Sequence, residues 1–290
     1  MFFAGIINII LSLFLWTSNL PTLVNSDAVV IALKPDASRP ELSADKGAVL
    51  AANDHFFLFT SRADEAQPIA SITKLMTALV FLDHNPGWQT SYKIVDADHV
   101  AGGRLNLFRG DEVIIKDLFY TSLIASDNGA TLALVHSTGL SEGNFVKKMN
   151  EKARQLGLAQ TSFQDPIGLS DNNVSTAREV ALLAQAALKR PEIRDATARR
   201  EYNFKTSGGR DKKIESTDYL LYDSSQDSLT VLGGKTGYTD KAGYCFVGLL
   251  QDERGREVIS VVLNSSGKND RFRESRNLAN WVFKSYNWGK

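Results

Sequence analysis

Hydrophobic residues recur with helical spacing through the middle of the chain and form short runs near both ends. In residues 68–82, apolar side chains at Ile72, Leu75, Met76 and Leu79 repeat every three or four positions, which predicts a helix with one buried face. Ser71 lies in its first turn, and the helix is expected to end near residue 85. The same spacing predicts further helices over residues 116–125, 130–135, 142–156, 176–187 and 271–286.

Short apolar runs between turn residues predict strands. The runs at 47–52 and 56–60 are separated by Asn53-Asp54-His55, which is a hairpin signal. Further strands are expected at 229–232, 244–250 and 258–263. Strands at both ends with helices between them indicate one α/β (α+β) unit, in which both chain ends contribute to the sheet. We therefore expect a single domain, 47–290, with a helical lobe inserted at about 88–200.

The N-terminal residues 1–26 differ from the rest of the chain, because no charged side chain appears before Asp27. Their apolar run, followed by Pro21 and the small residue Ser26, predicts a secretory signal peptide, although the usual basic residue is missing. An uncleaved membrane anchor is the alternative. We expect an exported protein of the periplasm or cell envelope, with residues 27–46 as a loosely attached N-terminal extension.

Composition excludes several classes of function. The 290 residues include 33 basic and 33 acidic side chains, so the net charge is zero and no basic field indicates nucleic-acid binding. The single cysteine, Cys245, excludes an internal disulfide framework and a multi-cysteine metal site. The four histidines lack metal-ligand spacing, and no phosphate-binding loop is present. We therefore expect neither a metal nor another cofactor.

Ser71 and Lys74 are three residues apart at the start of a predicted helix, so their Cβ atoms should lie roughly 5–6 Å apart. A serine hydroxyl is a poor nucleophile without an adjacent base. A lysine in a dry site can lose its proton and become that base. The alternative is a helix cap beside a solvated lysine. The same S-x-x-K spacing starts at Ser43 and Ser265, but neither residue opens an apolar helix.

Two further motifs carry candidate chemistry. Ser126-Asp127-Asn128 offers a hydroxyl for proton relay and an amide that can orient a substrate carbonyl. Lys235-Thr236-Gly237 follows a predicted strand and offers an ammonium and a hydroxyl, which suit a substrate carboxylate; the alternative is a surface turn. A second S-D-N copy at 170–172 lies in a polar loop, so we prefer Ser126.

The three motifs together are far more specific than any one of them. The chain resembles the serine D-alanyl-D-alanine carboxypeptidases and endopeptidases, the low-molecular-weight penicillin-binding proteins, over roughly residues 47–285. The resemblance implies the penicillin-recognising serine peptidase fold, β-lactamase/transpeptidase-like, with a mainly antiparallel sheet flanked by helices and an inserted helical lobe. The segments that carry it are PIASITKLMTA, SLIASDNGA, GLSDNNVSTARE and GGKTGYTDKAGYC.

The resemblance also implies roles for the residues of the first two motifs. Ser71 would be the nucleophile that forms the acyl-enzyme, and Lys74 would be its general base. Ser126 would relay a proton towards the leaving amine, and Asn128 would contact the substrate amide.

The third motif is implied to recognise the carboxylate end of the substrate. Lys235 and Thr236 of the K-T-G motif, which ends at Gly237, would hold the terminal carboxylate. The backbone N–H groups of Ser71 and Tyr238 would form the oxyanion hole. Arg271, rather than Arg273, is the preferred match for an additional carboxylate-binding arginine; a charge on the helix surface is the alternative for either.

The resemblance makes peptidoglycan peptides the expected substrate and β-lactam antibiotics the expected covalent inhibitors. The chain ends soon after its last helix, without the small β-domain and amphipathic anchor of many family carboxypeptidases. This length and the GLSDNNVSTAR stretch are more similar to the endopeptidase branch, which cleaves D-alanyl–diaminopimelate cross-links. D-alanyl-D-alanine carboxypeptidase activity is the alternative.

Two rivals belong to other classes. A class A β-lactamase needs a glutamate in an E-x-x-L-N pattern after S-D-N, and the corresponding region, 161–166, contains none. A non-catalytic cell-wall-binding protein of the same fold would have no need of Lys74. Any contact with a membrane is expected only through an N-terminal anchor.

Overall fold

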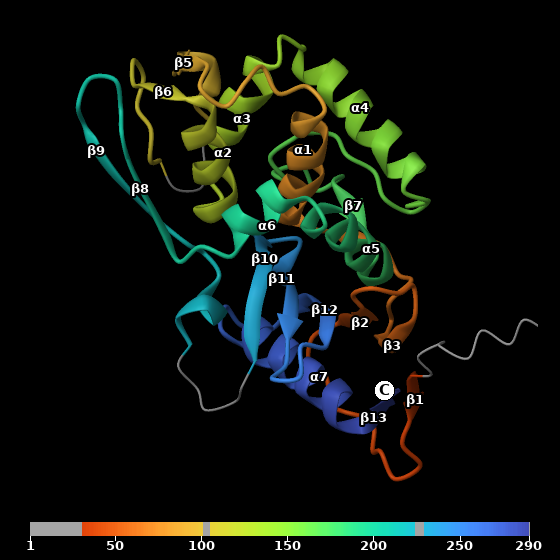
Figure 1. The fold of residues 1–290 in the computed structure, drawn as a ribbon. Coiled ribbons are helices and arrows are strands. Elements are labelled where there is room, and N and C mark those ends of the chain that lie inside the picture. The colour runs from red at the N-terminus through yellow and green to blue at the C-terminus, as the bar shows by residue number, and fades with distance from the viewer. Residues whose placement is uncertain (1–30, 101–104, 224–228, 290) are drawn as a thin grey trace, which may run out of the picture.

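A five-stranded antiparallel sheet lies at the centre of the computed structural model, which describes residues 31–100, 105–223 and 229–289. Two strands from the N-terminal part of the chain pair beside three from the C-terminal part, in the order β10-β11-β12-β2-β3 (Figure 1). This arrangement confirms the predicted fold class. The strands are β2 (Lys46–Ala51), β3 (Phe57–Ser61), β10 (Thr230–Thr239), β11 (Gly243–Gln251) and β12 (Glu257–Ser265).

Helices cover both faces of the sheet. Alternate residues of β2 enter two different hydrophobic cores, because successive side chains of a strand point to opposite faces. Ala48 and Leu50 belong to the larger core, and Val49 and Ala51 to the smaller one. Helix α5 (Ala177–Leu188) packs on the first face, and α7 (Asp270–Ser285) packs on the second.

The inserted lobe is helical, as the apolar spacing predicts. Figure 1 shows α1 to α4 gathered above the sheet, with α6 close to β10. The helices predicted near residues 71, 116, 130 and 142 are all present within a few residues of their expected bounds. They are α1 (Thr73–Leu82), α2 (Ile115–Ile124), α3 (Asn128–Ser137) and α4 (Glu142–Gln155).

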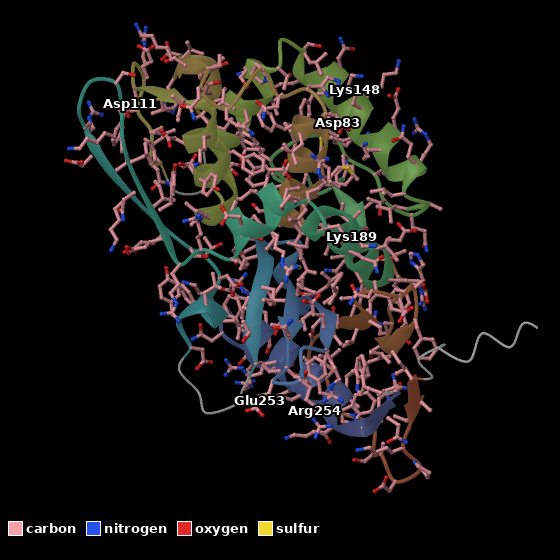
Figure 2. The ribbon with its side chains drawn as sticks, viewed as in Figure 1. Asp83, Asp111, Lys148, Lys189, Glu253 and Arg254 are labelled. Atoms are coloured by element: carbon pink, nitrogen blue, oxygen red, sulfur yellow. The ribbon has the colours of Figure 1, made fainter. Side chains whose placement is uncertain are left out.

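Several small elements were not predicted. The hairpin of β8 (Glu201–Lys205) and β9 (Asp211–Glu215) lies beside the lobe (Figure 1), where Arg210 and Lys212 each form a 3.0 Å ion pair with Asp111, a residue labelled in Figure 2. Its strands have too few apolar residues to be recognised by alternation. The unpredicted elements are α6 (Pro191–Thr197), the hairpin of β8 and β9, and the short pairs of β5 (Ser91–Lys93) with β6 (Glu112–Ile114) and β4 (Gln67–Pro68) with β7 (Val174–Ser175). The described part of the chain also contains the 3-10 turns η1 (Ala70–Ile72), η2 (Asp96–Asp98) and η3 (Tyr219–Tyr222).

The N-terminal extension is not loosely attached where the structure describes it, and that prediction is wrong from residue 31 onwards. Strand β1 (Ile31–Leu33) pairs antiparallel with β13 (Tyr286–Trp288), at the end of the chain. Trp281 Nε1 donates to the carbonyl of Ser38 at 2.6 Å. The apolar residues of β1 indicate a strand, but no local pattern records that its partner lies at the other end of the chain. The predicted signal peptide lies outside the described residues, among which no helix has the length and apolar character needed to cross a membrane.

Candidate active site

Ser71 lies in the 3-10 turn η1, immediately before α1. Two glycines from distant segments press on this turn. A Cβ on Gly237 of β10 would lie 2.6 Å from the carbonyl oxygen of Ile69, and one on Gly168 would lie 2.2 Å from that of Ala70. Such distances are too short for carbon and oxygen, so only glycine lets these backbones approach the serine. The turn is therefore held between the edge strand β10 and the loop that contains Gly168.

Lys74 is completely buried beside the serine. Its Nζ donates to Ser71 Oγ at 3.0 Å, to Asn128 Oδ1 at 2.7 Å and to the carbonyl of Ile167 at 2.6 Å. Burial lowers the pKa of the Lys74 ammonium to about 7, against the weaker opposing attraction of nearby carboxylates. A substantial fraction of this amine is therefore neutral near pH 7, and a neutral amine can accept the proton of the Ser71 hydroxyl.

The S-D-N motif forms the turn between α2 and α3. Ser126 has a left-handed backbone conformation, with φ of 58°, which non-glycine residues seldom adopt. Asp127 caps α3 by accepting from the N–H of Ala130 at 2.8 Å, and it also accepts from the N–H of Asn106 at 3.0 Å. The aspartate thus fixes the turn, while the serine and Asn128 on either side of it face the site.

Lys235 reaches the S-D-N turn from β10. Its Nζ donates to Ser126 Oγ at 2.7 Å, across 109 positions of the sequence, and to the carbonyl of Thr236 at 3.0 Å. Burial lowers the pKa of the Lys235 ammonium well below its ordinary value, and the positive charges of Lys74 and Arg271 lower it further. Thr236 Oγ1 shares a 2.7 Å hydrogen bond with Thr217 Oγ1, which fixes the hydroxyl of the K-T-G motif.

Arg271 approaches the same strand from the first turn of α7. Its Nη1 donates to the carbonyls of Gly237 at 3.0 Å and Cys245 at 3.3 Å, and its guanidinium lies over the ring of Tyr244. The side chain is buried, so it is not a helix-surface charge. A second cation is therefore placed beside the K-T-G motif.

A cavity of about 260 Å³ borders most of these groups, although Lys74 and Lys235 do not line it. Among the residues that the structure describes, none that lines the cavity carries a carboxylate. Three large hydrophobic side chains at its rim are substantially exposed: Leu169, Tyr219 and Tyr238. The cavity is lined by Ser71, Ala125, Ser126, Asn128, Leu169, Thr217, Tyr219, Thr236, Gly237, Tyr238, Lys268 and Arg271.

The rival copies of the motifs lie outside this arrangement. Ser170 accepts from the N–H of Asn172 within an exposed loop, and neither residue lines the cavity. Ser43 and Ser265 both donate to the carboxylate of Glu274. The chain context that favoured Ser71 and Ser126 therefore agrees with their positions in space.

Sequence reasoning missed the parts of the site that come from outside the three motifs. Thr217 lines the cavity from a segment before η3 with no recognisable motif. Asp165 accepts from the N–H of Ile167 at 2.8 Å and so shapes the loop whose carbonyl binds Lys74. Only the Asp165-Pro166 dipeptide, a turn signal, could have indicated an ordered loop there.

The antiparallel sheet, the inserted helices and a serine–lysine pair at their junction together define a class, the penicillin-recognising serine enzymes. Comparison with known proteins narrows this class. A profile of the D-alanyl-D-alanine carboxypeptidases, peptidase family S11, matches residues 34–267. The chain therefore belongs to this family.

Some relatives are named D-alanyl-D-alanine endopeptidase, and others are named D-alanyl-D-alanine carboxypeptidase. A D-alanyl-D-alanine endopeptidase of Escherichia coli K12 is 31% identical over 249 residues, which cover 85% of this chain and 79% of that protein. One from Haemophilus influenzae is 33% identical over 215 residues, covering 73% and 72%. Penicillin-binding protein D2 of Listeria monocytogenes, solved in a cefotaxime-bound form, superposes with a TM-score of 0.72 at 32% identity, covering 85% of this chain and 99% of that one.

Proposed function

We propose that the protein is an exported serine D,D-peptidase that cleaves D-alanyl cross-links between peptidoglycan stem peptides. One observation carries this proposal: the amine of buried Lys74 lies 3.0 Å from the Oγ of Ser71, and Ser71 lines a cavity together with Thr236 and Gly237 of the K-T-G motif. The lowered pKa of Lys74 supports its role as general base.

The proposed reaction proceeds through an acyl-enzyme. Neutral Lys74 takes the Ser71 proton as Oγ attacks the carbonyl carbon of the penultimate D-alanine. The carbon–nitrogen bond of the tetrahedral intermediate then breaks, and the leaving amine receives a proton through Ser126. Water hydrolyses the resulting ester and restores Ser71. The backbone N–H groups of Ser71 and Tyr238 are the proposed donors to the oxyanion.

Substrate recognition is assigned to the groups on the other side of the cavity. Lys235, Thr236 and Arg271 are proposed to bind the carboxylate beyond the scissile bond, since a hydroxyl and two cations converge there. Asn128 is proposed to hold the substrate amide through its side-chain amide group, while its Oδ1 accepts from Lys74. Gly237 allows the strand to lie against the turn of the nucleophile.

Preference for cross-links over free stem peptides is supported by the names of the two endopeptidase relatives. The exposed Leu169, Tyr219 and Tyr238 offer apolar surface to a leaving peptide longer than one residue. Removal of a terminal D-alanine, the carboxypeptidase reaction, is the second candidate, because the family profile carries that name. The same carboxylate site serves both reactions.

β-Lactam antibiotics are proposed as covalent inhibitors that acylate Ser71, as the cefotaxime-bound relative suggests. A class A β-lactamase would need a carboxylate to activate the deacylating water. None of the residues that line the cavity in the described part of the chain is acidic. We therefore infer that the acyl-enzyme formed with a β-lactam persists.

Purified muropeptides test the substrate preference. Cross-linked dimers and monomeric pentapeptides are incubated separately with the protein, and the products are separated and identified by mass spectrometry. Conversion of dimers to monomers, with slower release of D-alanine from pentapeptide, is expected. Rapid D-alanine release with intact dimers would replace the endopeptidase assignment by the carboxypeptidase one, and no product from either substrate would contradict the D,D-peptidase assignment.

A further inference from the structure

Asp218 is a buried carboxyl group behind the K-T-G motif. Its side chain caps η3, where Oδ1 accepts from the N–H of Leu220 at 3.0 Å. The residue is only 3% exposed and does not line the cavity. Its second oxygen, Oδ2, has no hydrogen-bond partner among the described residues. Asp218 therefore has one oxygen committed to local structure and one that is not.

The uncommitted oxygen is directed at the strand that carries Lys235. A Cβ built on Gly234 would lie 3.1 Å from Asp218 Oδ2, so the carboxylate lies against the backbone of β10 one residue before the lysine. The glycine leaves room for this approach. The adjacent Thr217 contributes the hydroxyl that bonds to Thr236, so one short segment supports the K-T-G motif at two points.

The charged side chains that act on Asp218 are both cations. Lys235 approaches from β10 and Arg271 from α7, both buried, and Lys74 of α1 adds its charge to the field at Lys235. Burial raises the pKa of the Asp218 carboxyl to about 7, although both neighbouring cations oppose this rise. In return, the negative form of Asp218 raises the pKa of Lys235.

We propose that Asp218 is a positioning residue for carboxylate recognition, whose buried charge keeps Lys235 protonated in the free enzyme. This inference rests on the proposed function, because it takes Lys235 as the ligand of the substrate carboxylate. A neutral Lys235 would lack the charge that attracts this carboxylate, and burial together with two nearby cations favours the neutral form. Asp218 opposes that tendency without occupying the site where the substrate binds.

Asp218→Asn tests the proposal, because asparagine keeps an oxygen for the N–H of Leu220 and removes only the charge. Its rate of acylation by benzylpenicillin is measured between about pH 5.5 and 8.5, beside that of wild type. Asp223→Asn is the matched control, since Asp223 is exposed on the same segment and pairs with Arg276. The second ligand is the methyl ester of the same penicillin, which has no carboxylate.

Without the negative charge, the pKa of Lys235 falls and its charged fraction decreases at neutral pH. We expect Asp218→Asn to reduce acylation by benzylpenicillin about tenfold above neutrality, the effect of roughly one pKa unit. The reduction should shrink as the pH falls and should be small for the ester. Asp223→Asn should match wild type with both ligands.

Unchanged acylation of Asp218→Asn at every pH would overturn the proposal, and so would an equal loss with both ligands, which would indicate a purely structural role. Wild-type protein that is not acylated at all would instead overturn the proposed function. If Asp218→Asn does not fold, the ratio of wild-type acylation rates with benzylpenicillin and with its methyl ester, measured over the same pH range, replaces it. A ratio well above one at about pH 8 supports the proposal, because a charged Lys235 attracts the carboxylate; a ratio that has fallen to one by about pH 7 would show that Lys235 is neutral and would overturn it.

Discussion

Lys74 combines two properties that a solvated lysine lacks. It is completely enclosed, and its three hydrogen-bond acceptors are Ser71 Oγ, an amide oxygen and a backbone carbonyl, none of them a carboxylate. The nearest acidic groups, Asp127 and Asp165, attract its proton only weakly compared with the cost of burial. An ammonium in such a place loses stability relative to the neutral amine. The alternative of a helix cap beside a solvated lysine is therefore excluded.

Ser71→Ala and Lys74→Ala should abolish acylation by penicillin to a similar extent, because a nucleophile and its base act as one unit. A loss of at least about 10³-fold is expected for each. Mass spectrometry of the wild-type protein after incubation should locate one adduct on the peptide that contains Ser71. Near wild-type acylation of Lys74→Ala would show that another group is the base, and an adduct on Ser43, Ser170 or Ser265 would show that another serine is the nucleophile.

The pH dependence of acylation should report the two buried lysines. Lys74 acts when neutral, so the rate should rise with pH through its pKa of about 7. Lys235 acts when charged, so the rate should fall again at higher pH. Because the pKa of Lys235 is lowered, this fall should begin closer to neutral pH than it would for an ordinary lysine. Stopped-flow measurement across this range should give a bell-shaped profile. A profile that falls with pH throughout would contradict the role of Lys74.

At the scale of elements, the site depends on how closely β10 approaches the turn η1. This approach is possible because Gly237 has no side chain facing Ile69, and a similar gap at Gly168 admits the loop that binds Lys74. The glycine of K-T-G is thus required by packing between two elements. Its presence in the motif signals a close backbone contact as much as a contact with substrate.

Gly237→Ala should therefore separate β10 from η1 and weaken both stability and acylation. Overpacking of this kind costs about 1–3 kcal/mol of unfolding free energy. Gly143→Ala is a suitable control, because Gly143 lies in α4 with open space where a Cβ would lie, and alanine favours a helix. Thermal unfolding and penicillin labelling of both variants check the prediction. Equal stability and labelling of Gly237→Ala and wild type would show that the contact is not required.

Secondary structure could be predicted where burial followed a simple period. The helices α1 to α5 and α7 each have an apolar face, and β11 and β12 are nearly continuous apolar runs, so their existence was clear. The hairpin of β8 and β9 could not be recognised because only Tyr202, Phe204 and Ile214 of its strand residues are hydrophobic. Lys212 is buried through its ion pair with Asp111 and its position over the ring of Phe108. Ion pairs leave no periodic signal.

At the scale of the whole molecule, the site lies where the sheet meets the inserted helices. The nucleophile and base come from the start of α1, the S-D-N turn from between α2 and α3, and the K-T-G motif from the edge of the sheet. Arg271 enters from the helix on the opposite face. Because these parts come from both the sheet and the inserted helices, the placement of the helices relative to the sheet determines the geometry of the reaction.

Catalysis should proceed without a metal ion. Within the described residues, no group of histidine, cysteine, aspartate and glutamate side chains is arranged to hold one. The proposed reaction places all proton transfers on Lys74 and Ser126. Dialysis against EDTA should leave the rates of peptide cleavage and penicillin acylation unchanged. Loss of activity on chelation, with recovery on addition of zinc, would contradict this mechanism.

The sequence by itself determined the three motifs, their order and the elements that carry them, because apolar spacing and motif chemistry are local properties. It also distinguished Ser71 and Ser126 from their rival copies, since only these two open apolar helices. Only the tertiary structure decided that Lys74 is dry, that Lys235 reaches Ser126 and that Asp218 lies behind β10. Desolvation and charge pairing depend on segments far apart in the chain, and no local pattern records which of them will meet.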